Sequence, residues 1–275
     1  MDWRKPLCSG GLLGLLLTAL GAELAWAGAW TRQAGDGFTS RTIRYFQTDS
    51  GGENARFKEL GISVYTEYGV IDPVTIGLEI DQGLRLDIAA KGQQGGRTSA
   101  FIRTRLWTGE DGDVFSLQFG GSLPVSGVQS GAIPGGDDAR EIKGLMQYGR
   151  GFVTDWGNGW AEAALGYAHF TGGRADEIKL DLTTGIRPTE NWIGIAQMFG
   201  TFSLRDAAFA EPDFDIVKVK LSLGRKIFGN RTLLIGLSRD VYTRGADPGF
   251  EVSVSLWSNF TLEGLFIDED GISGD

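Results

Sequence analysis

Apolar and polar residues alternate along most of this chain, from Phe38 to Phe260. Over residues 74–81, for example, Val, Ile, Leu and Ile alternate with Thr, Gly, Glu and Asp. A period of two places successive side chains on opposite faces of an extended strand, whereas a helix would need a period of 3.6. The chain is therefore predicted to be all-β, with one apolar and one polar face on each strand.

The repeats of this alternation predict twelve strands. They cover residues 38–46, 57–68, 74–89, 97–108, 113–123, 139–149, 159–170, 176–187, 191–204, 213–224, 231–241 and 250–260. The 43 glycines among 275 residues, and an aromatic content of 11%, suit strands joined by turns.

The first 27 residues have the order of a secretory signal peptide. Arg4 and Lys5 precede an uncharged stretch over residues 7–22, and small residues follow at Ala25 and Ala27. This stretch is shorter than the roughly 20 residues that a spanning helix needs, so a retained anchor is the weaker alternative. We expect cleavage after Ala27, which makes 1–27 the removed signal.

Cys8, the single cysteine, lies inside the predicted signal peptide. A mature chain without cysteine would have no disulfide, no thiol catalysis and no cysteine-bound metal. The net charge of −9 argues against a nucleic-acid partner. No cofactor or metal is expected. The acidic turns around Asp111 and Asp137 lack the ligand spacing of a calcium loop and are interpreted as solvated turns.

Three features favour a membrane barrel over a soluble one. The predicted strands are long enough to cross a bilayer when tilted. Long and short connections alternate, as they do between the two sides of an outer-membrane barrel, although the connections around 151–158 and after residue 170 break the rule. Aromatic residues gather near the predicted strand ends, where a membrane interface is expected: Tyr45, Phe46, Tyr68, Trp107, Tyr148, Trp160, Phe170, Trp192, Tyr242 and Phe260.

Residues 28–260 are therefore predicted to form one antiparallel, up-and-down transmembrane β-barrel of about twelve strands. Closure leaves no open backbone edge, which lipid could not hydrogen-bond. We expect a bacterial outer-membrane location, contact with outer-membrane lipid, and help from the barrel-assembly machinery during insertion. The acidic segment 261–275 is predicted to be a periplasmic tail.

Two segments resemble a known family. Residues 28–38 read GAWTRQAGDGF and residues 67–77 read EYGVIDPVTIG. They resemble the entry segment and first periplasmic hairpin of bacterial outer-membrane barrels of the MetA pathway of phenol degradation, a transporter-like type. The resemblance implies a channel-like barrel for small apolar or aromatic compounds and transfers no catalytic residue. Such barrels usually end on an aromatic residue, whereas here an acidic tail follows Phe260.

Charged residues on the polar faces are the candidate lumen-lining positions. They are Glu67, Glu79, Asp81, Arg103, Arg105, Lys143, Glu162, Lys179, Asp181, Lys218, Lys220 and Glu251. Opposite charges are expected to pair across the lumen, because an unpaired buried charge is costly. The interior is then either a wet conduit for small solutes, with weak ion selectivity, or a plugged, salt-bridged core.

His169, the only histidine, is the first residue to weigh for catalysis. Some twelve-stranded membrane barrels are phospholipases with a serine, histidine and asparagine site on the outer surface. Here Phe170 and Thr171 follow His169, so no serine stands at the expected place and packing is the favoured interpretation. The sequence thus predicts a porin-like channel without catalysis, with a lipid-modifying enzyme or a plugged structural barrel as alternatives.

Overall fold

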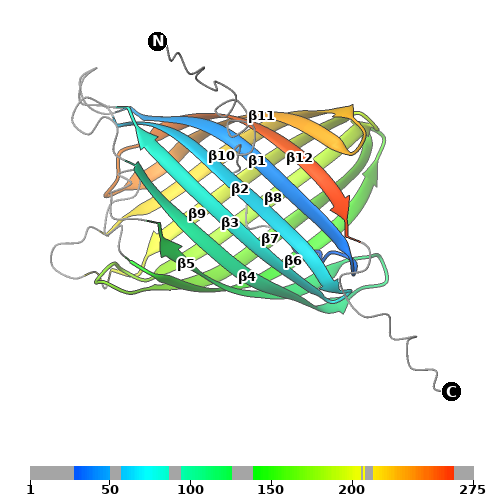
Figure 1. Cartoon of the computed structure of the whole chain (residues 1–275), viewed down its shortest axis with the longest axis horizontal. Helices are drawn as coiled ribbons and strands as arrows, with labels where there is room; N and C mark the ends of the chain where they lie inside the picture. The colour runs from blue at the N-terminus through cyan, green and yellow to red at the C-terminus, as the bar shows by residue number, and fades with distance from the viewer. Residues whose placement is uncertain are drawn as a thin grey trace, which may run out of the picture.

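Twelve antiparallel strands form one closed barrel in the computed structural model (Figure 1). The structure describes residues 28–49, 57–86, 94–125, 139–205, 207 and 213–262. Its strands are β1 (Asp36–Thr48), β2 (Lys58–Ile71), β3 (Val74–Arg85), β4 (Gln94–Thr108), β5 (Val114–Pro124), β6 (Glu141–Thr154), β7 (Gly157–Phe170), β8 (Glu177–Thr189), β9 (Trp192–Ser203), β10 (Asp215–Phe228), β11 (Arg231–Arg244) and β12 (Gly249–Thr261). The predicted all-β barrel is confirmed.

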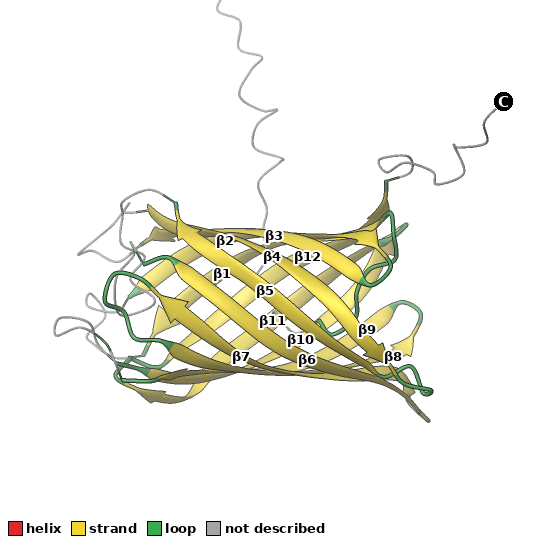
Figure 2. Ribbon diagram, turned by 90° about the horizontal axis from the view of Figure 1, so that it is seen from below, coloured by secondary structure: helices red, strands yellow, loops and turns green. Residues whose placement is uncertain are grey.

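Closure comes from the pairing of the first strand with the last. Each strand pairs with its sequence neighbours, and the β1–β12 seam runs from Asp36 opposite Thr261 to Thr48 opposite Gly249. The strands are 11 to 15 residues long and slant across the barrel (Figure 2). Each strand therefore has at least the roughly 9–11 residues that a tilted strand needs to cross a bilayer.

The two faces of the barrel wall differ as the alternation predicts. On β3, Leu78 and Ile80 are 46% and 37% exposed on the outer surface, whereas Glu79 between them is buried inside. On β10, Leu221 is 61% exposed and Lys220 is buried. An apolar surface of this kind is poorly solvated by water and suits lipid.

The two ends of the barrel differ in the length of their connections. At the end where β1 begins and β12 finishes, which we call the turn end, the connections are 72–73, 109–113, 155–156, 190–191 and 229–230. At the opposite loop end they are 49–57, 86–93, 125–140, 171–176, 204–214 and 245–248. Four of the five connections at the turn end have two residues and the fifth has five, whereas those at the loop end have four to sixteen residues.

The exception around 151–158 disappears because the predicted strand 139–149 ended too early and the predicted strand 159–170 began too late. β6 continues to Thr154 and β7 begins at Gly157, so only the turn 155–156 joins them. The alternation weakened there because two glycines fall within residues 149–151. The connection after β7, at 171–176, is longer than any connection at the turn end.

The predicted aromatic residues of the interface fall on both faces of the wall. Trp107 and Tyr242 are exposed on the outside, at 52% and 49%. Phe46 and Phe170 are buried inside, and Trp160 lines an interior cavity. For these three residues the interface prediction is wrong, because closeness to a strand end does not determine which face a side chain occupies.

Two predicted segments lie outside the described residues: the signal peptide at 1–27, and the tail beyond residue 262. Signal cleavage and a periplasmic tail therefore stay predictions. Within the described ranges, no helix is long and apolar enough to span a membrane.

Substitution of Leu221 tests whether the outer surface faces lipid. An arginine at this position in the middle of β10 would have to hold its charge in hydrocarbon. We expect Leu221→Arg to lower the free energy of unfolding in lipid vesicles by about 2–4 kcal/mol. The control Leu221→Phe stays apolar and should change it by less than about 1 kcal/mol. Equal stability of the two variants would contradict a lipid-facing β10.

Candidate functional site: the barrel interior

Charged side chains line the inner wall of the barrel. The strand register places the twelve candidate positions on that face: Glu67, Glu79, Asp81, Arg103, Arg105, Lys143, Glu162, Lys179, Asp181, Lys218, Lys220 and Glu251. Several are deeply buried, with Arg103 at 1% exposure and Glu251 at 2%. Charges this deep need compensating partners.

Ion pairs supply that compensation along the wall. Arg44 on β1 lies 2.7 Å from Asp81 on β3 and 3.2 Å from Glu59 on β2. Lys220 on β10 lies 3.3 Å from Glu251 on β12. The expectation of pairs across the lumen is wrong for these residues, because their partners stand one or two strands away. Pairing of this kind compensates buried charge without a bridge through the middle of the barrel.

A second charged network lies near the loop end, at the starts of β6 and β8. Lys143 contacts Glu141 at 2.9 Å on the same strand. The carboxylate of Glu177 accepts hydrogen bonds from both Arg174 and Lys179. Positive and negative groups are therefore mixed at this end, which does not favour strong selection between anions and cations.

The residues before β1 fold back into the barrel. We call residues 28–35 the N-terminal segment. Its main chain binds inward-facing side chains: Ser116 donates a hydrogen bond to the carbonyl of Ala29, and Arg103 donates one to the carbonyl of Trp30. Because these partners stand on β4 and β5, the segment lies along the inner wall.

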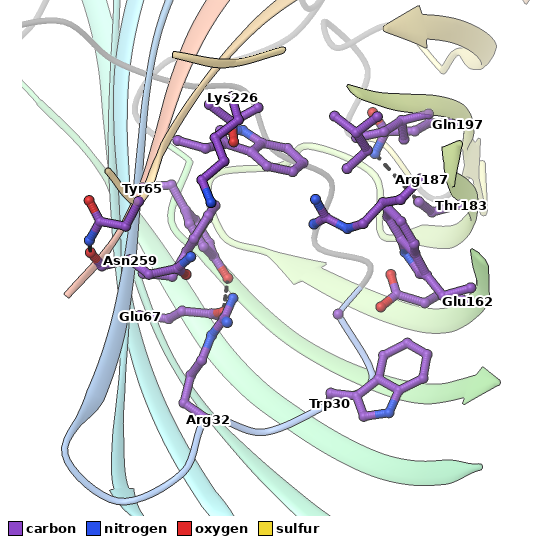
Figure 3. Close-up of a pocket in the computed structure, with 18 of the residues that line it drawn as sticks. Trp30, Arg32, Tyr65, Glu67, Glu162, Thr183, Arg187, Gln197, Lys226 and Asn259 are labelled. Atoms are coloured by element: carbon purple, nitrogen blue, oxygen red, sulfur yellow. Dashed lines mark hydrogen bonds and ion pairs between the residues drawn. The ribbon is translucent and has the colours of Figure 1, made fainter. Parts of the chain in front are cut away.

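The side chain of Arg32 anchors the same segment. Its guanidinium forms an ion pair with Glu67 on β2, which also binds Arg103 at 3.2 Å and accepts a hydrogen bond from Tyr65 at 2.8 Å. The backbone N–H of Arg32 donates to Thr75 on β3 at 2.7 Å. Figure 3 shows Arg32 directed toward Glu67, with Trp30 on the same segment. The N-terminal segment therefore narrows the lumen from the β2–β5 side.

Two glycines of the wall allow the segment to approach closely. A Cβ atom at Gly69 would lie 2.0 Å from the carbonyl oxygen of Gln33, and one at Gly149 would lie 2.6 Å from the ring of Trp30. Real Cβ atoms do not come so near, so a larger residue would force the segment to move. The sequence placed Gly149 in a predicted strand and Gly69 directly after one, but gave no sign of this contact.

A cavity of about 670 Å³ remains beside the N-terminal segment, toward the turn end (Figure 3). Trp30, Arg32 and Glu67 line one side. Apolar residues of the inner face line the other side: Ile193, Ile195, Trp160 and Trp257, which form one cluster with the buried Leu234 behind them. The interior therefore has a charged zone near the loop end and a partly aromatic cavity near the turn end.

The apolar cluster is the part of the interior that sequence reasoning missed. The strand 191–204 was predicted, but its outward residues Gly194 and Ala196 are too small to contrast with Ile193 and Ile195. The inner face becomes clear only from the pairing of Ile195 with Gly185 on β8 and with Ser222 on β10. The alternation within one strand does not show which strands place their apolar residues beside Ile193 and Ile195.

His169 lies on the outer surface at the loop end, on the same face of β7 as Leu165 and Tyr167. Its Nδ1 lies 2.9 Å from Asp176, which also accepts hydrogen bonds from Tyr167 and from the backbone of Phe170. Burial raises the pKa of Asp176, but these hydrogen bonds outweigh it and hold the pKa below its usual value. Among the described residues, no serine or threonine hydroxyl is hydrogen-bonded to His169.

The acidic turn between β4 and β5 is held by local contacts. Asp113 accepts a hydrogen bond from Tyr148 at 2.6 Å, and Asp111 pairs with Arg150 at 3.3 Å. The described residues contain no group of three His, Cys, Asp or Glu side chains suited to a metal ion. The second acidic turn, at Asp137, lies outside the described residues.

The sequence matches no protein-family model and no curated protein. The barrel is similar to the solved COG4313 outer membrane channel from Pseudomonas putida F1, with a TM-score of 0.60, 11% identity, and coverage of 86% of this chain and 100% of that one. The KdgM porin (TM-score 0.48, 11% identity, coverage 80% and 99%) and an active-site mutant of outer membrane phospholipase A from Escherichia coli (TM-score 0.48, 11% identity, coverage 84% and 91%) also match. The first likeness shows the fold alone.

Gly149→Ala tests the contact between wall and segment. The added methyl group would meet Trp30 and Ala29. We therefore expect the free energy of unfolding to fall by about 1–3 kcal/mol, as it does at other overpacked sites. The measurement is the temperature at which the folded, unboiled band disappears on a gel. Gly151→Ala is the matched control, because nothing lies within 4 Å of its new Cβ. If both variants melt alike, the segment does not pack against Gly149.

Proposed function

We propose that this chain is a channel of a bacterial outer membrane that lets small molecules pass, without catalysis. The observation that carries the proposal is the cavity beside the N-terminal segment, which leaves part of the lumen unfilled. A ring of twelve strands lies between filled eight-stranded barrels and open porins of 16 or more, so a narrow conduit fits its size. Outer-membrane lipid and the barrel-assembly machinery would be its partners during insertion.

The distribution of charge supports the same proposal. Arg44, Asp81, Lys220 and Glu251 pair along the wall rather than across the lumen. Hydrated small solutes could therefore pass between these pairs without breaking them. Because both signs are present, we expect weak discrimination between small anions and cations in the charged zone.

Conductance of the purified, exported protein in a planar lipid bilayer is the direct test. We expect discrete current steps. The double variant Trp30→Ala with Arg32→Ala should give larger steps, because it removes a bulky ring and the ion pair that holds the N-terminal segment to Glu67. Gln33→Ala, an exposed position of the same segment, should leave the step size unchanged. Absence of steps at any voltage would contradict the channel and favour a structural barrel.

A lipid-modifying enzyme is the alternative with one observation in its favour. Asp176 orients His169 on the outer surface, as a catalytic histidine would need. The nearby hydroxyl of Thr171 instead accepts a hydrogen bond from the backbone of Arg140. Hydrolysis of phospholipid vesicles that disappears in His169→Ala would favour the enzyme, and hydrolysis that is absent or independent of His169 would count against it.

A further inference from the structure

Two cationic side chains extend into the cavity from the wall opposite the N-terminal segment. Arg187 on β8 and Lys226 on β10 both line it, and Figure 3 shows them directed into it. Arg187 lies 5.9 Å from the centre of the Trp160 ring. Within the described residues, neither side chain forms an ion pair or a side-chain hydrogen bond with the protein.

The other charges of the cavity are arranged differently. Arg32 and Arg103 share Glu67 as their partner. Glu162 extends from β7, the strand next to β8, and Figure 3 shows it on the same side of the cavity as Arg187. Glu190 belongs to the turn 190–191 at the rim. The described lining therefore holds four cations and three carboxylates, and the two cations to which it gives no ion-pair partner stand on the wall opposite Glu67.

The same wall is apolar beside these cations. Ile193 is 1% exposed and Ile195 is 7% exposed, and the rings of Trp160 and Trp257 pack against the cluster that the two isoleucines form with Leu234. The Nε1 of Trp257 is buried, and no described residue accepts its hydrogen bond. An indole N–H is a donor only, so it would suit an acceptor group on a ligand.

From this arrangement we propose that the cavity binds small organic anions in which one carboxylate is attached to an aromatic or compact apolar body. The guanidinium of Arg187 and the ammonium of Lys226 hold the carboxylate, for which the fork of an arginine is well shaped. The body packs against Ile193, Ile195 and Trp257. A volume of about 670 Å³ is in the range of small-molecule sites. The inference rests on the proposed channel function and narrows its solutes to a chemical class.

Titration calorimetry on the full purified barrel in a nonionic detergent tests this inference. The probes are benzoate, benzyl alcohol, benzylammonium and acetate, which separate the charge from the apolar body. We expect the Kd of benzoate to be at least about tenfold lower than that of each other probe, which corresponds to a binding free energy more favourable by ~1.4 kcal/mol. The double variant Arg187→Gln with Lys226→Gln should weaken benzoate binding about tenfold and leave benzyl alcohol binding within about twofold.

Arg231→Gln is the matched control, because it removes one positive charge at the same end of the barrel from a residue that does not line this cavity. It should bind benzoate as the unaltered chain does. Equal binding of benzoate and benzyl alcohol, preference for benzylammonium, or unchanged benzoate binding in the folded double variant would each overturn the inference. Benzoate binding by a barrel that shows no conductance would support the site and contradict the channel. Conductance without a preference for benzoate would support the channel and contradict the site.

Discussion

Backbone hydrogen bonding around a closed ring is the interaction on which the rest of this structure depends. The seam between β1 and β12 gives both terminal strands a second partner, so no edge is left along the described wall. In hydrocarbon each unpaired N–H or C=O would cost several kcal/mol, which makes closure a requirement. Once the ring is closed, the register decides which side chains face outward and which face inward. The apolar surface around Leu221 and the buried charge of Glu251 both follow from that register.

The interior is organised by a second constraint, the compensation of buried charge. Pairs such as Arg44 with Asp81 join strands only one or two places apart, so ion pairs through the middle of the lumen are not needed to compensate these charges. The N-terminal segment also compensates buried charge, because Arg32 forms an ion pair with Glu67 and the carbonyl of Trp30 accepts a hydrogen bond from Arg103. What stays unfilled is the cavity near Trp257, where aromatic rings and the cationic Arg187 and Lys226 share the wall opposite the N-terminal segment.

The alternation in the sequence was sufficient to predict the barrel, its strand number and the faces of residues such as Leu78 and Glu79. The alternation could not locate the cavity, because the cavity is lined by strands that are far apart in the sequence. Which of their residues lie at the same level of the barrel is not visible in any one strand. Trp257, for example, packs against Phe38 and also against the Ile193 cluster. Nor could it reveal the N-terminal segment as an interior element, because its contacts are largely made by the main chain.

Spin-label accessibility along β3 tests the central claim most directly. Single labels from Ile76 to Asp81, in a variant without Cys8, would be exposed in a lipid bilayer to oxygen, which concentrates in lipid, and to a water-soluble nickel chelate. The account predicts collisions with oxygen at Ile76, Leu78 and Ile80, and much weaker ones at Glu79 and Asp81. Uniform access of the nickel chelate, or a reversed alternation, would show that this wall does not separate lipid from a polar interior.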